Sequence, residues 1–169
     1  NLLGLLREAR MVLNQQLWPY LRAHGLSITE PQWRVVRALT RDELRIKHGV
    51  ETGRVAKDAR ILSPSLSGIL ARMEQSGLVT REKAPNDARL SIVKPTEKCL
   101  EIVESMREPL EAYYRWLEQR FGTENLAQLY RLLDMIIEMG PDAQPDVSPG
   151  RGNPEGASRA GSAAEFADE

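Results

Sequence analysis

Short polar side chains and one arginine follow one side of residues 63–73, and their types suit contact with a nucleic acid. These residues are Ser63, Ser65, Ser67, Gly68 and Arg72. Apolar residues recur between them at three- and four-residue spacing, which predicts a helix with one buried face. They are Leu66, Ile69, Leu70 and Met73. The outer face would offer hydroxyls, a glycine and an arginine to a major groove, although an ordinary solvated polar face has the same composition.

A basic hairpin is predicted directly after this helix. Ser63 is expected to cap the helix, with Pro64 in its first turn, and Gly77 is expected to end it in a left-handed conformation. Residues 78–83 and 90–94 then have the character of two strands joined by a charged turn. The hairpin carries Arg81, Lys83, Asp87 and Arg89. A basic hairpin beside such a helix can reach the DNA backbone or the minor groove.

A second short helix is predicted just before the first. Thr52 is expected to cap a helix over residues 53–59, and residues 61–62 form the turn into the next helix. A short helix, a short turn and a helix with a polar outer face make a helix-turn-helix. The cations of the leading helix can touch phosphates or only solvate its surface. They are Arg54, Lys57 and Arg60.

The distribution of charge points to a nucleic acid more clearly than the total does. The 169 residues carry a net charge of −1 and are 41% hydrophobic, as in an ordinary soluble single domain. Residues 53–98 hold nine Lys and Arg against five Asp and Glu, a net charge of +4, whereas residues 140–169 hold two against six. A clustered positive patch is the electrostatic footprint of a nucleic-acid binder.

Two helices are predicted before this basic segment. Residues 2–23 have helical periodicity, with a bend caused by Pro19 expected near residues 15–18 and an end at Gly25. The second helix starts with a capping box at Thr29. Residues 41–49 lack a clear period and are expected to be a loop that can include one helical turn, before a short strand.

Two apolar helices are predicted after the hairpin. Thr96 is expected to cap a helix that runs to about Arg120 and bends at Pro109, and Thr123 to cap the last helix. The last helix has a broader apolar side than a lone helix needs, and the first helix is also rich in leucine. These helices predict a dimer interface. From Gly140 on, the composition predicts a disordered acidic tail.

Few residues suit catalysis or metal binding. One cysteine allows no disulfide framework, and His24, His48 and Cys99 have no metal-ligand spacing. No glycine loop that could cradle a phosphate is present, so neither an enzyme nor a cofactor is expected. No apolar run approaches about 20 residues and no secretory signal is visible, which favours a cytoplasmic protein without a membrane partner.

Three segments, in this order, resemble the MarR family of bacterial transcription regulators. They are residues 26–39 (LSITEPQWRVVRAL), residues 61–79 (ILSPSLSGILARMEQSGLV) and residues 87–96 (DARLSIVKPT). Arg10, Trp18-Pro19 and Gln32-Trp33-Arg34 resemble most the branch that controls catabolism of aromatic acids, such as the homoprotocatechuate-operon regulators. The chain departs from the family by a longer stretch over residues 40–49, by Gly68 in place of a larger polar residue and by Cys99 in place of a common glycine.

The resemblance implies a mainly α fold with a small β-wing, in which residues 26–95 form a winged helix-turn-helix lobe. Residues 1–25 and 96–139 would form a helical dimerisation region, and residues 140–169 the tail. Asp87 would hold the wing turn and Arg89 would enter the minor groove. The homodimer would read a pseudo-palindromic operator on double-stranded DNA, in the cytoplasm and at the bacterial nucleoid.

The resemblance also implies an effector site between the dimer helices and the DNA-binding lobe. A small aromatic carboxylate needs a cation or donor and apolar walls there, and its binding would release the repressor from an aromatic-compound catabolic operon. The candidate residues are Arg10, His24, Trp33 and Arg34. Three of them have structural alternatives, with Trp33 as core, His24 as a helix cap and Arg34 as a salt bridge.

Two other functions fit the same sequence. Cys99 lies in the first turn of a helix, where the helix dipole lowers a thiol pKa, so the protein could be a redox-responsive regulator or the cysteine could be inert. The winged helix could also serve only as a protein-interaction module. Loss of the oxidant response in Cys99→Ser and loss of DNA affinity in Arg89→Ala would discriminate between these functions.

Overall fold

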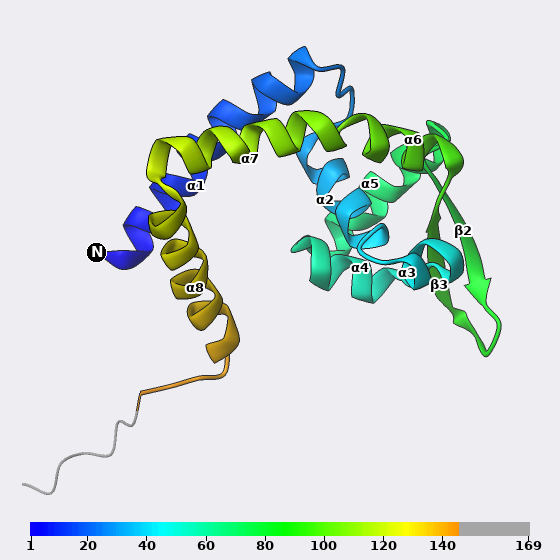
Figure 1. Cartoon of the computed structure of the whole chain (residues 1–169). Coiled ribbons are helices and arrows are strands. Elements are labelled where there is room, and N and C mark those ends of the chain that lie inside the picture. The colour runs from blue at the N-terminus through cyan, green and yellow to red at the C-terminus, as the bar shows by residue number, and fades with distance from the viewer. Residues whose placement is uncertain (146–169) are drawn as a thin grey trace, which may run out of the picture. The chain divides into compact units, whose positions relative to one another are not determined.

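Helices dominate the computed structural model, which describes residues 1–145 (Figure 1). The elements in chain order are α1 (Leu2–Ala23), α2 (Glu30–Leu39), α3 (Glu43–His48), β1 (Val50–Glu51), α4 (Thr52–Ala59), α5 (Ser63–Gln75), β2 (Val79–Ala84), β3 (Asp87–Pro95), α6 (Glu97–Ser105), α7 (Arg107–Phe121) and α8 (Thr123–Met139). The chain divides after Leu126 into two units, the second of which contains most of α8. Across residues 1–145, no helix has both the length and the apolar character needed to cross a membrane.

Helix α2 supplies the centre of the core, because its capping box and its apolar face both form. Thr29 Oγ1 accepts a hydrogen bond from Gln32 N, and Gln32 Oε1 accepts one from Thr29 N, which confirms the predicted box. The buried residues of α2 are Trp33, Val35, Val36, Ala38 and Leu39. They pack in one cluster with the apolar faces of α4 and α5, so the helix-turn-helix is built around α2.

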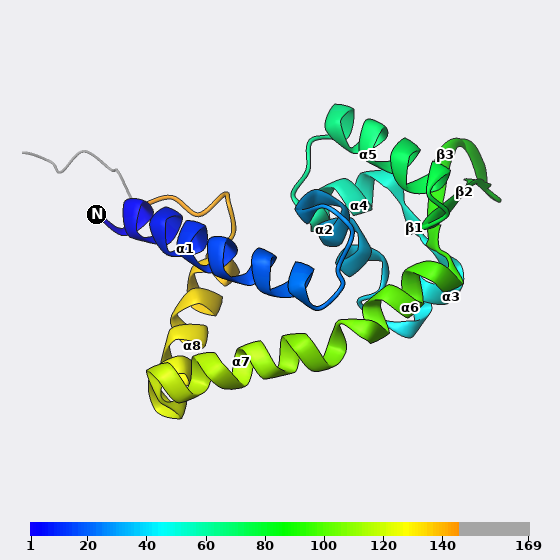
Figure 2. The same cartoon turned by 90° about the horizontal axis from the view of Figure 1, so that it is seen from above.

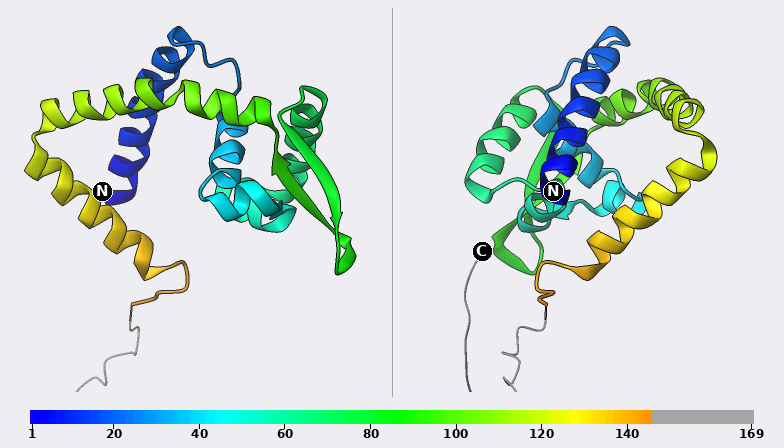
Figure 3. Two further views of the ribbon diagram at one scale, coloured as in Figure 1. Left: turned by 45° about the vertical axis from the view of Figure 1, so that its right-hand side comes forward. Right: turned by 90° about the vertical axis from the view of Figure 1, so that its left-hand side faces the viewer.

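The three strands form an antiparallel sheet in the order β1–β3–β2. Val50 pairs with Val93, and Val79 pairs with Pro95 at the base of the hairpin. The hairpin turns at Pro85–Asn86 and projects beyond the helices in the left view of Figure 3. A helix-turn-helix followed by such a hairpin is a winged helix-turn-helix, as the sequence predicts.

Helices α1 and α5 end at the glycines that the sequence predicts. Gly25 and Gly77 have φ values of 97° and 75°, which favour glycine because it has no Cβ. Leu26 N donates to the carbonyl of Leu21 at 3.0 Å, and Leu78 N donates to that of Met73 at 2.8 Å. Each leucine is buried, so each helix end is fixed by hydrogen bonds and by an apolar contact.

Helix α3 forms where the sequence predicts a loop. Asp42 Oδ1 accepts a hydrogen bond from Arg45 N at 2.9 Å and caps the helix, and Gly49 ends it with a φ of 77°. A Cβ on Gly49 would lie 2.8 Å from the carbonyl oxygen of Val93, so the close approach of β3 also requires glycine. The prediction allowed one helical turn within this loop, and the structure has a helix of six residues there.

The predicted caps of α4, α5 and α8 are wrong by one residue. Leu62 is the N-cap of α5, because Leu66 N donates to its carbonyl, so Ser63 is already the first helical residue. Likewise Glu51 precedes α4 and Thr52 lies inside it. Thr123 begins α8 as a helical residue and donates its hydroxyl to Glu118 Oε1 at 3.0 Å.

The long helix predicted after the hairpin is two helices, α6 and α7, which follow one another in Figure 1. Thr96 Oγ1 accepts a hydrogen bond from Cys99 N and caps α6, as predicted. The break lies at Met106, three residues before Pro109. Proline has no N–H for the carbonyl four residues earlier, which here belongs to Ser105, so the helix is interrupted at that turn. Gly122 ends α7 with a φ of 85°.

In the second unit, α8 presents a run of exposed apolar side chains. They are Leu129, Tyr130, Leu132, Met135, Ile136, Ile137 and Met139. Residues 140–145 form no helix or strand, and the rest of the predicted acidic tail, residues 146–169, lies outside the described residues.

Candidate nucleic-acid interface

Helix α5 presents the polar face that the sequence predicts. Ser63, Ser65, Ser67, Gly68 and Arg72 are all exposed. Leu66, Ile69, Leu70 and Met73 are buried on the opposite face. In Figure 2, α5 lies at the top of the view, and α3 lies apart from it at the lower right.

The first turn of α5 has no side-chain cap, which leaves its amide groups available. The N–H groups of Ser63 and Ser65 belong to the first helical residues and have no partner within the helix. Two neighbouring hydroxyls and the positive end of the helix dipole lie at the same place. Backbone amides at a helix N-terminus can bind a phosphate, so Ser63, which does not cap the helix, stays a predicted DNA contact.

Gly68 lies in mid-helix with open space before it. A Cβ at this position would meet only the Nη1 atom of Arg72, at 3.7 Å, which is an ordinary contact. The fold therefore does not need glycine here, and a glycine in a helix interior destabilises the helix relative to alanine by about 1 kcal/mol.

Hydroxyl groups from three elements meet in a hollow of about 300 Å³ beside α5. Its polar lining comprises Thr52, Gly53, Ser63, Ser67, Arg81 and Ser91. The structure thus brings three predicted residues together with Thr52, Gly53 and Ser91, which the sequence analysis did not select. Several hydroxyls beside one guanidinium suit a phosphate oxygen. The only sequence signal for Ser91 was its place in a strand beside the basic turn.

Asp87 orients Arg89 at the hairpin tip. Asp87 Oδ1 accepts hydrogen bonds from Arg89 N at 3.0 Å and from Arg89 Nε at 3.1 Å, and Oδ2 accepts one from Nη2 at 3.1 Å. The bond from the Arg89 side chain lowers the pKa of Asp87 and raises that of Arg89. The Arg89 side chain is 90% exposed, so its guanidinium is held in place and remains accessible.

Other predicted DNA contacts are already engaged within the protein. Arg81 pairs with Glu74 of α5 at 2.8 Å and thereby links the hairpin to that helix. Arg54 pairs with Asp58 at 3.2 Å, and Lys83 Nζ donates to the carbonyl of Ala88 at 3.2 Å. These residues position the elements of the lobe, and their contact with DNA stays a prediction. Lys57 is exposed on α4.

Three of the four candidate effector residues make structural contacts. Trp33 is buried in the core, and His24 caps α1 with its Nδ1 atom 2.8 Å from the Tyr20 carbonyl. Arg34 pairs with Glu30 at 2.9 Å and donates to the carbonyls of Ala59 and Arg60 at 2.9 and 3.0 Å. Arg10 is exposed on α1.

Helices α1 and α7 enclose aromatic rings that the sequence analysis did not assign to a site. Tyr20, Tyr113 and Trp116, with Gln16 and Ala112, line a hollow of about 370 Å³. The Tyr20 and Tyr113 ring centroids are 5.7 Å apart. Among residues 1–145, the Tyr113 hydroxyl is buried without a hydrogen-bond partner. Burial raises the pKa of Tyr113, and the neighbouring Tyr114 raises it further. The aromatic run at residues 113–116 was the available signal.

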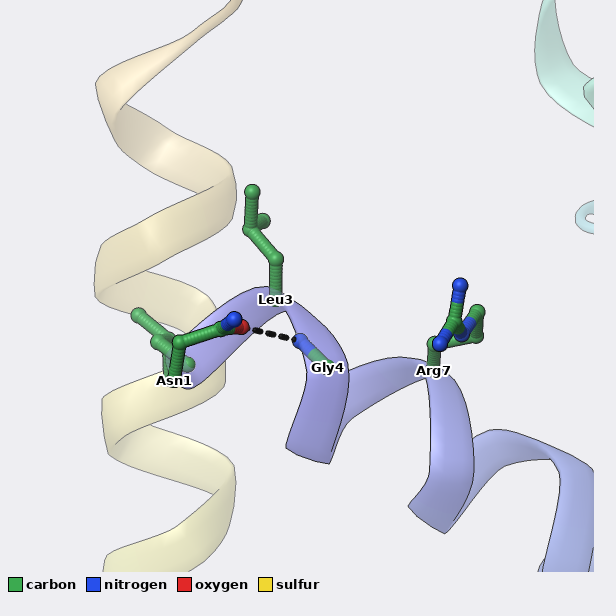
Figure 4. A pocket seen from close by; sticks show the side chains of 5 residues that line it. Asn1, Leu3, Gly4 and Arg7 are labelled. Carbon is green, nitrogen blue, oxygen red and sulfur yellow. Dashed lines mark hydrogen bonds between the residues drawn. The ribbon is translucent and has the colours of Figure 1, made fainter.

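A further hollow of about 480 Å³ lies along the first two turns of α1 and offers little chemistry (Figure 4). Asn1 Oδ1 accepts a hydrogen bond from Gly4 N at 2.7 Å and so serves as the helix cap. Leu3 and Arg7 project to the same side of the helix in Figure 4. Arg7 is the one charged group in a lining that is otherwise leucine, glycine and the cap.

Comparison with known proteins gives the same assignment as the geometry. Residues 28–91 match the model of the MarR family. The homoprotocatechuate degradative operon repressor of Escherichia coli is 37% identical over 142 residues, which cover 84% of this chain and 91% of the repressor. The crystal structure of transcriptional regulator PA4135 is 40% identical, with a TM-score of 0.72 over 83% of this chain and 98% of that one.

A second solved structure carries a ligand. NadR in complex with 4-hydroxyphenylacetate is 34% identical, with a TM-score of 0.64 over 81% of this chain and 92% of NadR. The polar α5 face, the wing with its oriented arginine and these relatives agree, and this chain therefore belongs to the MarR family, as a DNA-binding transcriptional repressor of that type.

Proposed function

We propose that this protein is a homodimeric repressor of an operon for the catabolism of an aromatic compound, and that a small aromatic carboxylate releases it from its operator. The observation that carries the proposal is the 34% identity to NadR, whose structure holds 4-hydroxyphenylacetate. The 37% identical E. coli repressor is named for a homoprotocatechuate degradative operon. Both compounds are aromatic carboxylic acids.

The distribution of exposed apolar residues supports a dimer. Among residues 1–145, all the large exposed apolar side chains except Leu44, Leu62 and Leu90 lie on α1, α7 and α8. Large exposed apolar side chains gathered on a few helices are characteristic of an interface. A symmetric pair of lobes would place two α5 helices against two half-sites of a pseudo-palindromic operator, about 34–36 Å apart.

The aromatic hollow between α1 and α7 supports an aromatic effector. Tyr20, Tyr113 and Trp116 supply apolar ring faces, and the unpartnered Tyr113 hydroxyl can bond a polar group of a ligand. A carboxylate also needs a cation, and Arg10 is the one of the four predicted effector residues for which the structure shows no structural contact among residues 1–145. We therefore retain Arg10 and add Tyr113 as effector residues.

The effector would act by differential affinity for two arrangements of the dimer. If it binds more tightly to the arrangement in which the α5 spacing does not match the operator, the DNA-bound population falls. Such couplings are typically worth about 1–3 kcal/mol, so we expect saturating effector to raise the operator Kd about 5–150-fold.

Fluorescence anisotropy on duplex DNA from the protein's own promoter tests the proposal. We expect 4-hydroxyphenylacetate to raise the Kd, and 4-hydroxyphenylethanol, which lacks the carboxylate, to have little effect. Arg10→Gln and Tyr113→Phe should weaken the response to the acid and leave DNA binding without it unchanged. If no aromatic acid in a panel changes either the Kd or the melting temperature, the effector proposal is wrong.

The structure does not favour the redox alternative. The Cys99 side chain is fully buried in the core, and burial raises its pKa to about 11. The reactive form of a cysteine is the thiolate, which is scarce at neutral pH at such a pKa. The interaction-module alternative has no support either, since the E. coli relative is named as an operon repressor.

A further inference from the structure

Four arginines surround a hollow of about 340 Å³ between α2 and α4, on the lobe but outside the α5 face and the wing. They are Arg34, Arg37, Arg41 and Arg60. Arg34 and Arg37 lie three residues apart on α2, and Arg41 follows two residues after the helix ends at Leu39. Like charges at the spacing of Arg34 and Arg37 repel one another, which weakens α2 unless an anion lies against them.

Most of this positive charge is not neutralised by the protein. Arg34 pairs with Glu30, but among residues 1–145 neither Arg37 nor Arg60 has a carboxylate within the 4.0 Å of an ion pair. Arg41 lies 4.0 Å from Asp58, a carboxylate that also pairs with two closer arginines of α3 and α4. Of the four guanidinium groups, that of Arg34 is thus paired, that of Arg41 shares a carboxylate, and those of Arg37 and Arg60 have none among residues 1–145.

Arg60 occupies a backbone position that favours glycine. It is the C-cap of α4 with φ 55° and ψ 48°, and it is the one residue other than glycine with positive φ in the part of the chain that the structure describes. A side chain in this conformation is strained. Glycine would suit this backbone conformation better than arginine. The fold therefore does not explain why the residue is arginine, and its guanidinium group is the remaining reason.

The lining suits an oxyanion and does not suit an aromatic acid. Its apolar residues are only Ala38 and Ala59, which cannot wall an aromatic ring. Guanidinium groups match phosphate oxygens with paired hydrogen bonds. Arg60 is also the first residue of the turn that leads into α5, which begins at Ser63.

We propose that this arginine hollow binds phosphate, and that the phosphate belongs to the backbone of the operator DNA. The footprint on DNA would then extend from α5 and the wing to the α2–α4 side of the lobe. The inference rests on DNA binding by the family and is independent of the aromatic effector. Phosphate ions or phosphorylated metabolites share the same chemistry, and the experiment separates the two sources.

The first part of the test compares DNA binding of Arg37→Gln and Arg60→Gly with that of the wild type. On a random-sequence duplex and on promoter DNA alike, each lost phosphate contact should lower the salt slope by about 0.9, or about 1.8 for a dimer. At about 0.1 M salt this corresponds to roughly 8-fold in Kd per contact. Arg22→Gln, which removes an exposed charge at the end of α1, should leave the slope unchanged.

Arg60→Gly is informative because it removes the guanidinium and relieves the backbone. Its melting temperature should be no lower than that of the wild type, since glycine adopts φ 55° without strain. If Arg60→Gly does not fold, Arg37→Gln, on the exposed face of α2, provides the same measurement. A lower salt slope in either folded variant supports the DNA source.

The second part measures the melting temperature in sodium phosphate against sodium chloride of equal ionic strength, without DNA. Phosphate should stabilise the wild type more than Arg37→Gln if ions in solution reach the hollow. If the variants keep the wild-type salt slope and lose the phosphate effect, the site binds phosphate from solution and not DNA. If they keep both the slope and the phosphate response, the hollow is not a phosphate site.

Discussion

Replacing Gly68 by alanine should separate the needs of the fold from those of DNA binding. The residue lies inside α5, and a Cβ there would touch only the Arg72 guanidinium, at 3.7 Å. Alanine is more favourable than glycine in a helix interior by about 0.8–1.0 kcal/mol, and nothing in the structure offsets this gain. For a chain of this size the melting temperature should rise by about 2–4 °C.

The same substitution should weaken DNA binding, because the glycine faces the same way as the exposed serines. A methyl group forced into a well-packed contact costs typically about 1–3 kcal/mol. That range corresponds to roughly a 5–150-fold rise in Kd. We therefore expect the variant to be more stable and to bind DNA more weakly. This result would indicate that Gly68 allows the helix to approach the DNA closely.

Thermal unfolding and fluorescence anisotropy on the same preparations provide the measurements. Ala71→Gly, about one helical turn further along α5, is the matched reverse substitution. It should lower the free energy of unfolding by about 1 kcal/mol. A lower melting temperature for Gly68→Ala would refute the inference of open space. A higher melting temperature with unchanged Kd would show that Gly68 does not approach the DNA.

Three further predictions concern single side chains. Arg89→Ala should weaken binding to any duplex and lower the salt slope by about 0.9 per contact, whereas Arg89→Lys should keep the slope; an unchanged slope in Arg89→Ala would exclude a phosphate contact. Cys99 should react with a thiol reagent at pH 8 only after unfolding, because burial raises its pKa to about 11, and a rapid reaction of the native protein would contradict its burial. Burial alone would raise the pKa of Asp58, but hydrogen bonds and charges from Arg45 and Arg54 lower it overall. The stability from Asp58 is therefore present above its unfolded pKa of about 3.9 and is lost as the pH falls through the lower folded value, so Asp58→Asn should destabilise by about 2 kcal/mol at pH 7 and by much less near pH 2 in denaturant titrations. A difference that stays constant with pH would show that the carboxylate charge contributes nothing.

Local signals predicted most of the fold correctly, since each was reinforced by the core. The capping box at Thr29 and the glycines at 25 and 77 specify helix ends within a few residues of sequence. The apolar periods of α2 and α5 agree with those ends, so pattern and cap point to the same structure. The order of elements obtained in this way is the one that resembles the MarR family.

Helix α3 was predicted as no more than one helical turn, because its stability depends on contacts outside its own residues. Its cap at Asp42 and its glycine at 49 are visible in the sequence, but six residues are too few to show a period. Arg45 fixes the helix by donating to the carbonyl of Ala38 at 2.9 Å and to Asp58 at 2.7 Å. No sequence pattern predicts this ion pair, whose partners lie thirteen residues apart.

The sequence predicts which side chains α5 exposes but not how the residues of the candidate site are paired. Periodicity shows which residues share the outer face of α5, and all of these are exposed. It cannot show that Arg81 is held by Glu74, or that three effector candidates are used as core, cap and salt bridge, because these contacts depend on the packed arrangement. Tyr113 was missed for the same reason, since its burial beside α1 follows from tertiary packing.

The pairing of each cation decides what it can contribute to DNA binding. An arginine such as Arg81 or Arg54 already has a carboxylate, and moving to a phosphate would exchange one ion pair for another with little gain. Arg37 and Arg60 release only counterions when a phosphate arrives, so they should contribute fully to the salt dependence. Arg89 lies between these cases, because its carboxylate partner fixes its direction and leaves it exposed. The salt slope of the dimer should therefore follow the number of lobe cations that have no carboxylate partner. That number is smaller than the nine Lys and Arg of residues 53–98, and it includes Arg37, which lies outside that range.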